Sequence, residues 1–204
     1  MYIWFKISML GMILSIPLYF LSVDHLKLKE KYGKEKGLII AKIFGLISGY
    51  LFFLFWIAIW ISPQPHYTIS ILQDILIQVP IINISIPILH LIIFLPFFLI
   101  GAWFGIMGVK EVGIKVAETH YTRKIITTGP YSLIRHPQYL GGLLTHIGIS
   151  FLLSAWYSLL FTPLMIGIIY LISRKEEKEL IREFDDIYEN YQKNVPMLFP
   201  RFKP

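Results

Sequence analysis

Long apolar runs separated by short charged stretches constrain this chain more than any other feature of its sequence. Residues 3–23, 38–61 and 88–108 each provide about the 20 apolar residues that an α-helix needs to cross the hydrocarbon core of a bilayer. The hydrophobic fraction of 55% and the mean hydropathy of +0.62 exceed the averages of soluble proteins. The chain is therefore predicted to be an all-α integral membrane protein.

Two further apolar stretches, residues 138–153 and 155–173, are predicted to form a helical hairpin. The charged stretch after residue 173 repeats apolar residues at three- and four-residue intervals, which indicates an amphipathic helix that stops near Pro196. The expected architecture is about five transmembrane helices, the last two a hairpin, followed by a cytoplasmic C-terminal amphipathic helix. For residues 3–23 a signal peptide is the alternative, but the sequence shows no A-x-A cleavage pattern.

The positions of lysine and arginine predict the orientation in the membrane. Residues 24–37, predicted to be a loop, are rich in lysine, and residues 62–87 contain neither lysine nor arginine. More basic residues follow the third apolar run: Lys110, Lys115, Arg123, Lys124 and Arg135. The positive-inside rule then places the N-terminus outside and the C-terminus in the cytoplasm. The apolar part of residues 62–87 contains Asp74 and two prolines, so an interfacial or re-entrant segment is expected there.

Composition excludes several classes of function. The net charge is +6, but the basic residues lie between apolar runs rather than on one basic face, so they indicate membrane topology and not nucleic-acid binding. The absence of cysteine excludes disulfides, thiolate nucleophiles and Fe–S clusters. The six histidines show no H-E-x-x-H or other ligand spacing, so no metal site is predicted. His66 and His90 are expected to be structural, and Trp56 and Trp60 to anchor a span at the membrane interface.

Residues 122–142, TRKIITTGPYSLIRHPQYLGG, form a polar segment between apolar runs. Arginine and histidine this close to a bilayer are costly unless they are paired or face water. Pro137 fits the first turn of a helix, whose free N–H groups favour an anion. Glu176 and Glu177 follow the last span and suit a cationic group, so a ligand that carries both charges would satisfy both ends. Ordinary interfacial ion pairs are the alternative.

Three motifs in this order carry a resemblance: GPYSLIRHPQYLGG, then EEKELIREF, then Y-x-x-Y-x-x-x-VPMLFP. Together they resemble the isoprenylcysteine carboxyl methyltransferases and the related membrane phospholipid methyltransferases, over roughly residues 110–204. The resemblance divides the chain into three N-terminal spans with their loops, residues 1–108, and a methyltransferase-like catalytic region, residues 109–204. It implies S-adenosylmethionine as the cofactor, and a lipophilic or prenylated acceptor that enters from the bilayer, with no nucleic acid and no metal.

The resemblance also implies roles for individual residues. The expected cofactor-binding residues are Lys124, Ile125, Ile126, Tyr131, His136, Pro137, Gln138, Tyr139 and Glu176. Arg135 and Glu177 are expected to be catalytic, and Arg174 to contact the substrate. Three positions depart from the family pattern: Ile172 replaces a basic residue, Asp185 replaces a glycine, and Asn194 replaces an arginine.

These departures affect the acceptor rather than the cofactor. The expected acceptor is the carboxylate of an isoprenylcysteine-like molecule, and a phospholipid amine is the alternative. A sterol-reductase-like enzyme that uses NADPH has its own R-H-P-x-Y motif and is a further alternative. The last alternative is a membrane protein without enzymatic activity that keeps the hairpin only as a scaffold.

Overall fold

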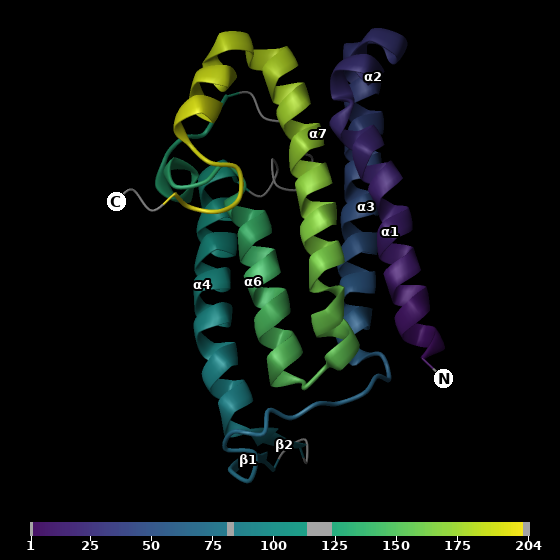
Figure 1. Ribbon diagram of the computed structural model, residues 1–204. Helices are drawn as coiled ribbons and strands as arrows, with labels where there is room; N and C mark the ends of the chain where they lie inside the picture. Colours follow the sequence, from purple (N-terminus) through teal and green to yellow (C-terminus); the bar gives the residue numbers. More distant parts are fainter. Residues whose placement is uncertain (1, 81–83, 114–123, 202–204) are drawn as a thin grey trace.

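The computed structural model describes residues 2–80, 84–113 and 124–201, and these are mostly helical (Figure 1). The elements are α1 (Ile3–Val23), α2 (His25–Tyr32), α3 (Lys34–Ile61), β1 (Leu76–Val79), β2 (Ile84–Pro87), α4 (Ile88–Val112), the 3₁₀ helix η1 (Gly129–Ser132), α6 (Pro137–Leu152) and α7 (Trp156–Asn194).

Four helices of the described ranges, α1, α3, α4 and α7, are long and apolar enough to cross a membrane. Helix α6 has 16 residues and falls short of the about 20 that a span needs. The prediction of a mostly helical membrane protein is confirmed, with four candidate spans instead of about five. Which side each terminus faces stays a prediction, and Lys115 and Arg123, which supported it, lie outside the described residues.

Helices α1, α2 and α3 form one packed group (Figure 1). The prediction of a lysine-rich loop between the first two spans is wrong, because that segment forms α2. Lysine and glutamate are good helix formers, so a charged segment is not necessarily a loop. Gly33, at a φ of 83°, separates α2 from α3. Gly37 permits their contact, since a Cβ there would lie 2.5 Å from the backbone of Leu28.

The connection between α3 and α4 contains a small antiparallel hairpin at one end of the bundle (Figure 1). Strand β1 pairs with β2 in a register that places Leu76 opposite Pro87. The all-α prediction is therefore wrong for this segment, where β-branched isoleucines alternate with other residues and favour strands. Ile71 and Leu72 just before β1 are exposed. An interfacial position for the segment remains a prediction.

Helices α4 and α6 pack closely because glycines face each other across their contact. A Cβ at Gly141 of α6 would lie 2.6 Å from the backbone nitrogen of Gly105 and 2.7 Å from the carbonyl oxygen of Gly101, both in α4. Small residues of this kind allow helix backbones to approach each other in membranes. The contact fixes the start of α6 against α4, and the polar residues of interest lie at that start.

Helix α7 extends far beyond the last apolar run and then reverses direction. The predicted hairpin of two apolar helices is present as α6 and α7, but the amphipathic helix is continuous with α7 up to a break at Asp185. Asp185 has φ 44° and ψ −130°, and the chain turns back there toward η1 (Figure 1). We call residues 186–194 the return leg. It ends at Asn194, close to the predicted stop.

Replacing Asp185 with glycine is expected to stabilise the protein. A non-glycine residue at this φ is strained by about 1–3 kcal/mol, and glycine removes the strain while adding about 0.5–1 kcal/mol of unfolded-state entropy. The expected net gain is about 1 kcal/mol, visible as a higher thermal midpoint in detergent. Asp186→Gly is the matched control, because Asp186 is helical and glycine there should lower the midpoint. Equal shifts in both variants would contradict the strain at Asp185.

Candidate functional site

The entrance to α6 forms as local sequence signals predict. Gly129 adopts a φ of 56° at the start of η1, His136 is the N-cap of α6, and Pro137 is its first residue. The backbone N–H groups of Arg135 and His136 donate to the carbonyl oxygens of Pro196 and Met197, at 2.9 and 3.1 Å. The segment after the return leg therefore holds the start of α6 in place.

His136 lies between two carboxylates and is 7% exposed. Its Nδ1 is 3.3 Å from Glu176 Oε2, and its Nε2 is 3.1 Å from Glu177 Oε1. Burial lowers the pKa of His136, but the hydrogen bonds that the ring donates to both carboxylates outweigh burial and hold the pKa above its usual value. A ring with both nitrogens against carboxylates donates from both, which is the form of an imidazolium.

The raised pKa of His136 predicts a pH dependence of stability. A group whose pKa is higher in the folded state stabilises the protein fully below its unfolded pKa, about 6.5 for histidine, and loses this contribution as the pH rises through the folded pKa. The thermal midpoint should therefore fall as the pH rises above neutrality. In His136→Gln this part of the pH profile should be flat, and an unchanged profile would contradict the assignment.

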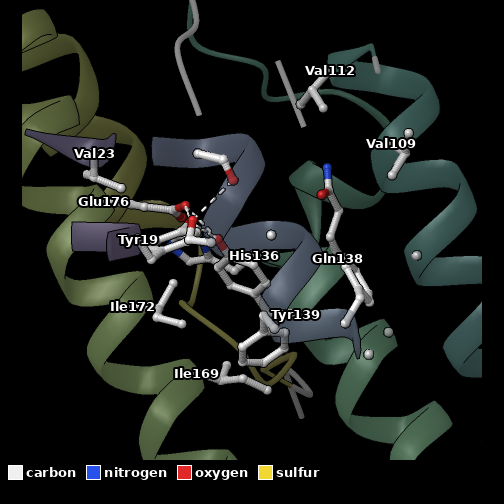
Figure 2. Close-up of a pocket in the computed structure, with 18 of the residues that line it drawn as sticks. Tyr19, Val23, Val109, Val112, His136, Gln138, Tyr139, Ile169, Ile172 and Glu176 are labelled. Atoms are coloured by element: carbon white, nitrogen blue, oxygen red, sulfur yellow. Dashed lines mark hydrogen bonds and ion pairs between the residues drawn. The ribbon is translucent and has the colours of Figure 1, made fainter. Parts of the chain in front are cut away.

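Glu176 is the centre of a second group of polar side chains (Figure 2). The hydroxyl of Tyr139 donates to Glu176 Oε1 at 2.5 Å, and the hydroxyl of Tyr19 donates to the same oxygen. The two hydroxyl oxygens lie 2.6 Å apart, and the ring of Tyr139 stacks on that of His136 with centroids 5.4 Å apart. Tyr19 was missed from the sequence, because it lies in α1 without a motif. Its only signal is its place on the buried face of α1, with Met12 and Ser15.

Arg135 and Glu177 form a buried ion pair at 2.6 Å, with side chains 9% and 5% exposed. A second nitrogen of the Arg135 guanidinium, Nη1, donates to the carbonyl oxygens of Gln192, at 3.1 Å, and Val195. Gln192 Nε2 donates to Glu177 Oε2 at 2.8 Å. Both carboxylate oxygens of Glu177 are thus engaged by side chains of the protein, and the pair joins α6, α7 and the return leg.

These groups border a cavity of about 1060 Å³ between the helices. The structure brings most of the predicted site residues to its wall. Those that line it are Lys124, Ile125, Ile126, Tyr131, Arg135, His136, Gln138, Tyr139 and Glu176. Pro137, Glu177 and Arg174 are not among the lining residues. Arg174 is exposed and lies 5.9 Å from the ring of Tyr170, so the structure does not bring this predicted substrate residue to the site.

The rest of the cavity wall is mostly apolar. It extends from the polar groups past Ile172 and Met165 to Trp56 and Trp60. Trp56 is 7% exposed and donates from Nε1 to Nδ1 of His146 at 3.0 Å, so its prediction as an interfacial anchor is wrong. Its aromatic neighbours and its buried hydrogen bond instead make it part of the core. The cavity therefore has a polar end and a long apolar remainder.

Comparison with known proteins agrees with this geometry. Residues 89–188 match the family described as phospholipid methyltransferase. This region is therefore similar to that family. The matched region runs from α4 to the return leg and contains the polar groups around His136 and Glu176, so the resemblance seen in the sequence is confirmed. Among the described residues, no group of three or more His, Asp or Glu side chains is placed to hold a metal ion.

Individual proteins are similar to this chain over less than half of its length. A methanethiol S-methyltransferase of Crocosphaera subtropica is 33% identical over 48% of this chain and 38% of its own length. The protein-S-isoprenylcysteine O-methyltransferase of Schizosaccharomyces pombe is 35% identical over 37% of this chain and 33% of its own. The mouse Delta(14)-sterol reductase is 28% identical over 41% of this chain and 21% of its own length. The matches thus cover well under half of each relative.

Proposed function

We propose that this membrane protein is a methyltransferase that uses S-adenosylmethionine to methylate a lipophilic acceptor that enters from the bilayer. The observation that carries the proposal is the cavity, in which Glu176, His136 and Tyr139 border one end and mostly apolar side chains line the rest. A polar end suits a charged cofactor, and an apolar remainder among helices suits a molecule dissolved in lipid. The relatives named as methyltransferases support the reaction class.

The residues present fit this cofactor. Its ammonium group would meet the carboxylate of Glu176, and its carboxylate would lie near the first turn of α6, where free N–H groups favour an anion. Tyr131 and Tyr139 line the cavity, and aromatic rings attract a sulfonium. A volume of about 1060 Å³ lies at the upper end of the range for ligand pockets, which suits a cofactor together with an acceptor.

When bound, the cofactor supplies a methyl group that is already activated on sulfur. The chain therefore has to position the acceptor and exclude water more than it has to generate a nucleophile. Tyr188 and Tyr191 of the return leg are buried and line the cavity, so the leg shields its polar end from water. Arg135 and Glu177, predicted to be catalytic, act in this proposal by holding that leg closed.

The first experiment is isothermal titration of the protein in detergent with S-adenosylhomocysteine and, separately, with NADPH. Binding of S-adenosylhomocysteine alone is the expected result. Binding of NADPH alone would assign the site to reductase chemistry, which the similarity to the mouse Delta(14)-sterol reductase makes the second candidate. Binding of neither by the folded protein would contradict both and favour a scaffold.

Replacing Gly49 with phenylalanine is expected to block the acceptor but not the cofactor. Gly49 of α3 lines the cavity, and a Cβ there meets nothing within 4 Å, so the ring would fill the apolar space without disturbing the helix contacts. Transfer of a labelled methyl group into membrane lipid extracts should fall at least about tenfold. The affinity for S-adenosylhomocysteine should stay unchanged.

The matched control is Gly167→Phe. Gly167 of α7 also has free space around it but does not line the cavity. If this variant lost as much transfer as Gly49→Phe, the effect would be a general one of added bulk in a span. The apolar part of the cavity would then not be the acceptor path.

A further inference from the structure

Glu179 is a buried carboxylate that the proposed reaction has not used. Its side chain is 1% exposed, and it lines the same cavity as Glu176, three residues earlier on α7. Oε1 is paired with the half-exposed Arg182. Oε2 has no hydrogen-bond partner in the described part of the chain. A buried carboxylate oxygen without a partner is costly, because it has lost water and gained nothing in exchange.

The neighbours of Glu179 on its helix face are both satisfied. Residues four apart share one face of a helix, so Lys175 and Glu183 flank Glu179 one turn before and one turn after. Lys175 pairs with Asp24, and Glu183 Oε2 lies 3.1 Å from His25 Nε2. The corner between α1 and α2 therefore covers this face and supplies partners above and below Glu179, but its described residues supply none to Glu179 Oε2.

The charges around the cavity favour a cation near Glu179. Among the described residues, its lining contains two permanent cations, Lys124 and Arg135. Arg135 is engaged by Glu177 and by the carbonyl oxygens of Gln192 and Val195. Lys124 is an exposed residue before η1. A carboxylate acceptor near Glu179 would meet a like charge in a poorly hydrated place, which disfavours binding by a large factor.

We infer that Glu179 selects the acceptor by binding the ammonium group of a lipophilic amine. An ammonium has no free electron pair, so Glu179 would also take one of its protons and leave the neutral amine nitrogen to accept the methyl group. This inference rests on the proposed function, because the alkyl part of the amine would occupy the apolar cavity while Glu176 is taken by the cofactor. An ammonium supplies the hydrogen-bond donors and the positive charge that Oε2 lacks. The inference separates the acceptor from the carboxylate of isoprenylcysteine, which the sequence led us to expect.

The test uses the protein saturated with S-adenosylhomocysteine and three probes of equal chain length: a long-chain primary alkylamine, the alcohol and the carboxylate. Isothermal titration at pH 7 should give roughly tenfold tighter binding of the amine than of the alcohol, and the weakest binding for the carboxylate. In Glu179→Gln the preference for the amine should vanish. Each probe partitions into detergent equally in the experiments with the wild type and with Glu179→Gln. The ratio of the two affinities for one probe therefore reports on the site alone. Glu189→Gln, at an exposed position of α7, should behave as the wild type.

Several results would overturn the inference, and they differ from failure of the proposed function. If S-adenosylhomocysteine does not bind the wild type, the proposed function itself fails, and the inference fails with it. If it binds but the wild type does not prefer the amine, or if Glu179→Gln keeps the preference, only the assignment of Glu179 is wrong. If Glu179→Gln weakens the binding of S-adenosylhomocysteine and leaves the binding of the amine unchanged, Glu179 belongs to the cofactor site.

Discussion

Replacing Arg135 with leucine is expected to lower the free energy of unfolding by about 3–5 kcal/mol, the largest stability effect of any substitution proposed for this chain. The side chain is 9% exposed and binds Glu177 Oε1 at 2.6 Å. Its removal leaves the buried carboxylate of Glu177 without its permanent counter-charge and leaves the carbonyl oxygens of Gln192 and Val195 without their donor. Unfolding in detergent, followed by helical circular dichroism, measures the loss.

Two companion variants test the reason for this loss. Arg174→Leu removes an exposed arginine that lies outside the cavity, and it should change stability by less than about 0.5 kcal/mol. The double variant Arg135→Leu with Glu177→Met should be more stable than the sum of the two single effects, because the buried unpaired charge disappears. Strict additivity would show that the pair is not coupled and would contradict this account.

Replacing Glu176 with glutamine is expected to reduce the affinity for S-adenosylhomocysteine by about 100-fold, since a charge-assisted contact to its ammonium group is lost. Glutamine keeps the length of the side chain, and its carbonyl oxygen still accepts from Tyr19 and Tyr139, so the fold should persist. Isothermal titration measures the affinity, and the thermal midpoint without ligand measures the fold. The expected pattern is weaker binding of S-adenosylhomocysteine and a nearly unchanged thermal midpoint.

Glu189→Gln, at an exposed position of the same helix, controls for the loss of one negative charge. It should bind S-adenosylhomocysteine as tightly as the wild type. If Glu176→Gln also keeps full affinity, the cofactor does not use this carboxylate. The polar end of the cavity would then need another ligand.

Much of the site follows from short-range signals in the sequence. Pro137 preceded by His136 predicts the start of a helix, and Gly129 before Pro130 predicts a turn, because each depends on backbone preferences of one or two residues. The apolar runs likewise predict α1 at its observed bounds, since length and hydropathy alone decide what spans a bilayer. These features require no knowledge of the neighbouring helices.

Other features depend on which segments meet, and the sequence does not state this. Tyr19 is 157 residues from Glu176, so no local pattern connects them. Trp56 looks like an interfacial aromatic until His146 is known to lie beside it. The structure also explains why glycine is usual in the family at one position: Asp185 occupies a backbone conformation that favours glycine. It does not explain Asn194.

The return leg has a consequence for biosynthesis. Arg135 receives its backbone partners from residues 57 and 60 positions later in the chain, which leave the ribosome long after α6 has been made. Until then its guanidinium lacks those acceptors near the bilayer, where an unpaired charge is costly. Assembly of the polar end is therefore a late event that follows insertion of the apolar helices. A nascent chain arrested before Gln192 would hold α4 and α6 but not the closed site.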